Sequence, residues 1–229
     1  MNKVKNAEFK SYTAREKELL QKRKRLRIFP LISLVIAGIL LLLMLSKWAA
    51  VYNSASNDYE IAINGFNCVA GGLSGEYTSA ETGGFGELST FYYHAGEIVP
   101  TLCALSVAVL FLVVAHALIQ LFALITNKQG VFNIVSIVFS AAIAAMFFAC
   151  YSVALSMDGP VIEGYCYGNP DCSIHSQAIL AGLFALLSIS SPALAMVLDK
   201  KSKRALRAEA EAAEQRSLKA NKPFRKKKK

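Results

Sequence analysis

Four stretches of the chain are apolar and free of Asp, Glu, Lys and Arg, and they cover residues 28–46, 98–127, 129–157 and 172–198. A helix needs about 20 apolar residues to cross roughly 30 Å of hydrocarbon, and each stretch is close to or above that length. Four such stretches are not typical of a chain that folds around a water-soluble core. The pattern therefore predicts an all-α transmembrane fold in which four helices form a membrane bundle.

Polar segments between the stretches set the boundaries of the predicted regions. The four transmembrane helices are expected at residues 28–51, 98–126, 132–156 and 178–198. The other regions are an N-terminal tail (1–27), a first outer loop (52–97), a short turn (127–131), a second outer loop with two cysteines (157–177) and a C-terminal tail (199–229). Ala, Glu, Lys and Arg are frequent in the last tail, so we expect the fourth helix to continue into it.

The first outer loop carries the pattern of a small β-hairpin. Residues 59–63 lead through Asn64-Gly65 into residues 66–70, and Asn-Gly is favoured in two-residue type I′ turns. A β-rich stretch at residues 88–93 adds a further candidate strand. We expect a hairpin or small sheet over the helix ends, with one apolar face made of Tyr59, Ile61, Ile63, Phe66 and Cys68.

The charged residues are distributed unevenly, and this orients the predicted helices. Residues 1–27 hold 10 of the 25 Lys and Arg residues and residues 199–229 hold another 13, whereas residues 52–97 contain six acidic residues and no basic one. Lys and Arg near short loops are retained on the cytoplasmic side of a membrane. We therefore expect both termini in the cytoplasm of a multi-pass protein of the plasma membrane, or of the endoplasmic reticulum in a eukaryotic cell.

The basic tails indicate what the protein contacts besides the lipid bilayer. Clusters of Lys and Arg next to a membrane helix attract anionic lipid headgroups, although retention on the cytoplasmic side explains the same clusters. Since the positive charge flanks membrane helices, no nucleic acid partner is predicted. The residues expected at the lipid surface are Lys22, Arg23, Lys24, Arg25, Lys200 and Lys201.

Cysteines in the outer loops are candidates for a disulfide. Cys166 and Cys172 bracket a short segment with Gly and Pro that allows a tight loop, so a bond between them is favoured in an oxidising exterior. The rival pairing joins Cys68 to one of these two, and only the geometry of the fold can decide. No metal site is predicted, because these thiols together with His94 and His175 lack recognisable ligand spacing.

Polar residues inside the predicted helices are the other candidates. His116 and Gln120 lie four positions apart and so share a helix face, and an ionisable residue within a membrane is by default a functional candidate. A neutral histidine that hydrogen-bonds across the bundle would serve packing alone. Ser188 and Ser191 precede Pro192, which removes a helix hydrogen bond and suggests a local kink in the fourth helix.

The loop lengths resemble those of claudin-type tetraspan proteins, with a β-rich first outer loop, a short inner turn and a short second outer loop. Gly65-Phe66-Asn67-Cys68 is faintly similar to the Gly-Leu-Trp…Cys segment of that family, but no second cysteine follows in the loop. The likeness is therefore one of architecture. The four-span disulfide oxidases of bacteria are similar in topology too, yet they present a Cys-x-x-Cys pair where this loop has only Cys68.

Catalytic motifs of the common kinds are missing from the chain. It contains no phosphate-binding glycine loop, no His-Glu-x-x-His pair and no serine-centred nucleophile elbow, and we expect neither enzymatic activity nor a cofactor. The predicted function is a non-enzymatic accessory or scaffold subunit that binds other membrane proteins or a second copy of itself. The alternative is a small transporter or channel subunit with a polar path near His116 and Gln120.

Overall fold

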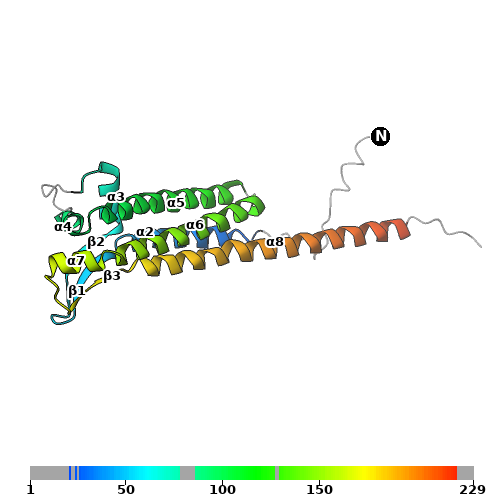
Figure 1. Cartoon of the computed structure of the whole chain (residues 1–229). Coiled ribbons are helices and arrows are strands. Elements are labelled where there is room, and N and C mark those ends of the chain that lie inside the picture. The colour runs from blue at the N-terminus through cyan, green and yellow to red at the C-terminus, as the bar shows by residue number, and fades with distance from the viewer. Residues whose placement is uncertain (1–20, 22–23, 25, 78–85, 127–128, 221–229) are drawn as a thin grey trace, which may run out of the picture.

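The computed structural model describes residues 21, 24, 26–77, 86–126 and 129–220, which form a bundle of long helices with a small sheet at one end (Figure 1). The long helices are α2 (Ile28–Leu43), α5 (Ile98–Thr126), α6 (Gln129–Leu155) and α8 (Ala178–Ala220). The shorter elements are the helices α3 (Gly65–Ser74), α4 (Gly86–Ala95) and α7 (Asp158–Tyr165) and the strands β1 (Lys47–Asn53), β2 (Asp58–Asn64) and β3 (Cys172–His175).

The four long helices close into a ring in which each packs on two neighbours. α2 lies against α5 and α8, and α6 completes the ring by packing on the same two helices. Inward side chains recur every three or four positions, as at Val109, Val113 and His116 of α5, which is the spacing of one helix face. The outward faces expose large apolar side chains, among them Phe111, Leu118, Phe122, Ile134, Val138 and Leu187.

Three of these helices, α5, α6 and α8, are long and apolar enough to cross a membrane, and the chain is therefore an integral membrane protein. α8 also continues through residues 199–220 of the C-terminal tail. α2 is a shorter apolar helix of 16 residues. The predicted first helix, 28–51, is thus too long by its last turns, because the chain leaves the helix after Leu43 and enters strand β1.

The sheet has three antiparallel strands in the order β2-β1-β3. In the central strand, Val51 faces Ile61 of β2 on one side and Ile174 of β3 on the other. β2 follows β1 directly, whereas β3 comes from the segment just before α8. The sheet therefore joins the two predicted outer loops, and it lies at the same end of the bundle as α3, α4 and α7 (Figure 1).

The predicted hairpin around Asn64-Gly65 is wrong. β2 pairs with β1, and the residues after Asn64 form helix α3 instead of a return strand. The Asn64 side chain caps that helix, since its Oδ1 accepts a hydrogen bond from the backbone N–H of Asn67 at 2.9 Å. Asn is as good a helix N-cap as it is a turn residue, so the dipeptide marked a strand-to-helix junction.

The second predicted strand, residues 88–93, is helical as well and lies within α4. Its buried side chains are Leu88 and Phe91, three positions apart, which fits a helix face and not the alternation of a strand. In β2 the apolar face predicted for this loop is partly present, since Ile63 is fully buried and Ile61 is half-buried.

Trp48 is the side chain that fixes the sheet to the bundle. It is fully buried, and its indole N–H donates to the backbone oxygen of Leu43 at 3.3 Å. Its ring meets the ring of Phe147 of α6 edge-on, with the centroids 5.6 Å apart. Gly65, the first residue of α3, lies so close that a Cβ there would be 2.7 Å from the indole atoms Cε2 and Cζ2. One aromatic ring therefore contacts the end of α2, the start of α3 and the middle of the bundle.

This contact predicts that Gly65→Ala destabilises the protein. The new methyl group overlaps a fully buried ring, and overpacking of this kind costs typically about 1–3 kcal/mol. The measurement is the thermal unfolding midpoint of the detergent-solubilised protein. Gly159→Ala in α7 is the matched control, because a Cβ there meets nothing within 4 Å. An equal midpoint for Gly65→Ala and Gly159→Ala would contradict the assigned packing of Trp48.

Candidate functional site

The interior of the bundle is polar in the half that lies toward the junction of α5 and α6. α5 contributes its C-terminal turns to this half and α6 its N-terminal turns, and all four long helices supply buried polar side chains. The members of this polar cluster are Ser33 of α2, His116 and Gln120 of α5, Asn133, Ser136 and Ser140 of α6, and Ser188 and Ser191 of α8. The sequence-predicted polar residues of α5 and α8 are thus brought into one region.

The other half of the bundle interior is mostly apolar, with Ser106 of α5 as a buried polar residue that donates to the Leu102 carbonyl oxygen of its own helix. Leu40 of α2, Met44 just after α2, Leu102 of α5 and Phe147 of α6 are all fully or almost fully buried there. They belong to one continuous apolar cluster that also includes Trp48. Polarity therefore changes along the bundle axis, which places the polar cluster on the side away from the sheet.

Part of the polar cluster is held by hydrogen bonds. The Gln120 side-chain amide donates to the Ser136 hydroxyl oxygen across the α5–α6 interface. The Ser191 hydroxyl donates to the Phe29 carbonyl oxygen of α2 at 3.0 Å, and the Ser188 hydroxyl donates to the Ala185 carbonyl oxygen one turn earlier in α8 at 2.6 Å. Gln120 and Ser191 therefore tie neighbouring helices together, while Ser188 is satisfied within its own helix.

The rest of the polar cluster has no hydrogen-bond partner among the described residues. Both ring nitrogens of His116 are buried and unpaired, as are Ser33 Oγ, Asn133 Nδ2 and Ser140 Oγ. A buried polar group without a partner costs about 1–3 kcal/mol, so water, an ion or another polar molecule would gain hydrogen bonds here. His116 is the only Asp, Glu, Lys, Arg or His residue in residues 98–127 and 129–157, and a proton relay would need a second group.

Asn133, Ser136 and Ser140 were missed by the sequence analysis. Their spacing of three and four positions places them on one face of α6, and that face is buried. A polar stripe inside an otherwise apolar run was the available signal. Their juxtaposition with His116 and Gln120 follows only from the antiparallel packing of α5 and α6.

The predicted disulfide is not formed, since all five cysteines are free. Cys166 and Cys172 do lie next to each other, and burial together with a hydrogen bond to the Cys172 thiol raises the pKa of Cys166 to about 12. The rival partner Cys68 is elsewhere: it is buried on α3 and hydrogen-bonds with Cys103 of α5. This placement follows from residues 65–74 being a helix that packs on α5.

Glu60 is another residue that the sequence analysis missed. Its carboxylate and the thiols of Cys166 and Cys172 have ligand atoms that all lie within 4.8 Å of one another. Two thiols and a carboxylate are ligand types that Zn²⁺ takes, and a tetrahedral site would need a fourth ligand. The strand pairing of β2, β1 and β3 brings this group together, which local spacing does not reveal.

The basic residues predicted at the lipid surface lie at the opposite end from the sheet. Lys24, Lys200 and Lys201 are exposed. Lys200 and Lys201 follow the point in α8 where the apolar sequence gives way to charged residues. Lys22, Arg23 and Arg25 lie outside the described residues.

No family model, curated protein or solved structure matches this chain. Its function is therefore inferred from its own residues and their geometry.

The polar cluster predicts different stabilities for two matched substitutions on α5. Gln120→Leu removes the hydrogen bond to Ser136 and should lower the thermal unfolding midpoint, by an amount corresponding to about 0.6 to 1.5 kcal/mol. His116→Leu removes no hydrogen bond that the described residues make, so its midpoint should stay at or above that of the parent. A larger loss for His116→Leu than for Gln120→Leu would show that the imidazole is bonded after all.

Proposed function

We propose that this chain is a four-span integral membrane protein that acts as a non-enzymatic accessory or scaffold subunit, and that it binds other membrane components through the projecting end of α8. The observation that carries the proposal is the shape of α8. This 43-residue helix runs well past the ends of α5 and α6 (Figure 1). A helix that stands clear of its own bundle offers its faces to a partner.

Four spans require that α2 crosses the membrane beside the three longer helices. Its 16 residues reach about 24 Å at 1.5 Å per residue, somewhat less than the hydrocarbon thickness. Residues 48–51 of β1, which are fully buried, would supply the rest of the path. The outward face of α2 supports this crossing, because Leu31, Val35 and Leu42 are 51%, 64% and 67% exposed and such a surface is suited to lipid.

The distribution of basic residues supports the orientation. If α2 crosses, both tails lie on the same side, and together they hold 23 of the 25 Lys and Arg residues. The cytoplasmic side retains such tails. The sheet and the loop between Cys166 and Cys172 then lie on the opposite, outer side of the membrane. The membrane that we propose is the plasma membrane, with the endoplasmic reticulum as the alternative in a eukaryotic cell.

The projecting end of α8 continues the helix face that packs on the bundle. Ala195 and Asp199 are buried on this face, and the less exposed positions beyond them recur every three or four residues. These positions form the α8 stripe, made of Ser202, Ala205, Leu206, Glu209 and Ala212. Apart from Glu209 these residues are small or apolar, and such residues at this spacing are typical of a helix that packs against another. The stripe therefore favours a helical partner, from another membrane protein or from a second copy of this chain.

An accessory role also fits the scarcity of reactive groups in the bundle. His116 is the only ionisable side chain of the polar cluster, and general acid–base or nucleophilic chemistry requires a second group within hydrogen-bond reach.

Transport is the second candidate function, and the unpaired imidazole of His116 favours it. The unpaired groups Ser33, Asn133 and Ser140 lie in the same half of the bundle. A gradient-driven ion or solute flux into liposomes that His116→Leu abolishes would establish this role, and a protein that supports no flux under any gradient excludes it.

The scaffold proposal predicts that Leu206→Glu reduces partner binding. A further carboxylate in place of the one large apolar side chain of the stripe costs roughly 1–3 kcal/mol if it is buried against a partner, so the yield of crosslinked complex in intact membranes should fall about fivefold or more. Crosslinking followed by mass spectrometry identifies the partner in the parent protein and measures its loss in the variant.

Ala208→Glu is the matched control, because Ala208 is exposed on α8 and lies outside the α8 stripe. Its crosslinked yield should equal that of the parent. A parent protein that stays monomeric and alone after gentle extraction, or equal yields for the two Glu variants, would refute the proposed role of the stripe.

A further inference from the structure

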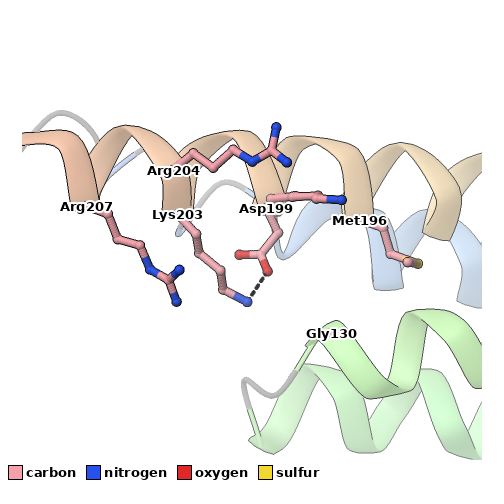
Figure 2. Close-up of a pocket in the computed structure, with 7 residues that line it drawn as sticks. Gly130, Met196, Asp199, Lys203, Arg204 and Arg207 are labelled. Carbon is pink, nitrogen blue, oxygen red and sulfur yellow. Dashed lines mark ion pairs between the residues drawn. The ribbon is translucent and has the colours of Figure 1, made fainter.

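A hollow of about 450 Å³ lies between α8 and the first turn of α6, at the end of the bundle away from the sheet. It is lined by Gly130 of α6 and by Met196, Asp199, Lys200, Lys203, Arg204 and Arg207 of α8. Figure 2 shows the side chains of Lys203 and Arg207 extending from α8 on the side where Gly130 lies. We refer to this hollow as the basic pocket.

The basic pocket carries an excess of positive charge. Four of its lining residues are Lys or Arg and one is acidic. That acidic residue, Asp199, is only 11% exposed and its Oδ2 lies 2.5 Å from Nζ of Lys203 (Figure 2). Its charge is therefore balanced within α8, and Lys200, Arg204 and Arg207 leave the pocket cationic. Arg in particular binds phosphate oxygens through its planar fork of N–H donors.

The start of α6 adds a second attraction for an anion. The first N–H groups of a helix have no partner within the helix, and the helix dipole is positive there. The first turn of α6 contains no acidic side chain, and a Cβ built on Gly130 would meet nothing within 4 Å. Gly130 therefore leaves open space beside the pocket, and the positive end of the helix dipole favours a phosphate group near the start of α6.

The surroundings of the basic pocket favour a lipid as the source of the phosphate. Val197, which is 62% exposed, precedes Lys200 and Arg204 by three and seven positions and so lies on the same face of α8. Val131 and Ile134, just after Gly130 in α6, are exposed apolar residues as well. An acyl chain can lie along these side chains while its headgroup reaches the cations. Free phosphate would gain nothing from them.

We infer that the basic pocket binds the phosphate group of an anionic glycerophospholipid. Arg207, which extends toward the side of Gly130, is its main ligand (Figure 2), Lys200 and Arg204 of the lining add positive charge, and the helix dipole at the start of α6 adds a further attraction. The inference depends on α8 crossing a membrane and not on the scaffold role of the α8 stripe.

The test measures lipid binding to the full-length protein in a non-ionic detergent at one salt concentration. Dioctanoyl phosphatidylglycerol is the anionic probe, and dioctanoyl phosphatidylcholine and inorganic phosphate are the comparison ligands. Phosphatidylglycerol should bind at least about tenfold more tightly than either. Arg204→Gln combined with Arg207→Gln should raise its Kd about tenfold or more, because each basic residue contributes substantially near an anionic headgroup.

Lys24→Gln combined with Lys201→Gln is the control pair. It removes the same charge from exposed residues at the same end of the bundle that do not line the basic pocket, and its Kd should change by less than about twofold. Gly130→Asp provides an independent variant. A carboxylate is favourable at a helix N-terminus, so the protein should fold, but it should repel the phosphate and weaken binding.

Equal losses for the two Gln pairs would overturn the inference, since they would indicate diffuse attraction to a basic surface. A second contrary result is that inorganic phosphate binds as tightly as phosphatidylglycerol and depends on the same two arginines. That result would refute a lipid as the ligand and indicate a site for free phosphate. Similar Kd values for phosphatidylglycerol and phosphatidylcholine would also contradict it. Loss of binding in Leu206→Glu is not expected, which separates this site from the scaffold role.

Discussion

Backbone N–H and C=O groups must stay hydrogen-bonded wherever a chain is shielded from water, and the rest of this fold depends on how that requirement is met after Leu43. α2 ends at Leu43, but residues 48–51 just after it are fully buried, so the chain needs a second way to pair its backbone where α2 ends. β1 supplies it, because it is hydrogen-bonded to β2 on one side and to β3 on the other. Trp48 is buried between Phe147 and Gly65 and packs the start of β1 against α6 and α3. The sheet, the start of α3 and the position of α8 are all arranged around it.

The two ends of the bundle have different chemistry as a result. The sheet end is packed with apolar side chains and free thiols, and it is covered by α3, α4 and α7. The other end combines the polar cluster, the basic pocket and the projecting part of α8. The basic surface attracts anionic lipid headgroups, the polar interior favours water, and the projecting part of α8 is available to a partner helix. Both proposals, the scaffold role and the lipid site, therefore concern this end.

The sequence predicted α5, α6 and α8 well, because an apolar run longer than about 20 residues has few alternatives to a membrane helix. Asn64-Gly65 was misassigned since the same dipeptide suits a hairpin turn and a helix start. β1 was taken for the end of a helix because only Ser46 and Lys47 separate its apolar residues 48–51 from the apolar run of α2, and its partner β3 lies more than 100 residues away. In the candidate site, His116, Gln120, Ser188 and Ser191 were found as isolated polar residues. Asn133, Ser136 and Glu60 were not, because only the packing of separate segments gives them neighbours.

The crossing of α2 is the central claim, and labelling on its two sides tests it most directly. Single cysteines replace Lys24 and Ser56, which are exposed before α2 and after β1, in a protein whose five native cysteines have been removed. The account predicts that a membrane-impermeant maleimide labels the Ser56→Cys protein in intact cells and reaches the Lys24→Cys protein only after permeabilisation. Labelling of both proteins in intact cells, or of neither, would place the two positions on one side of the membrane and contradict the four-span arrangement.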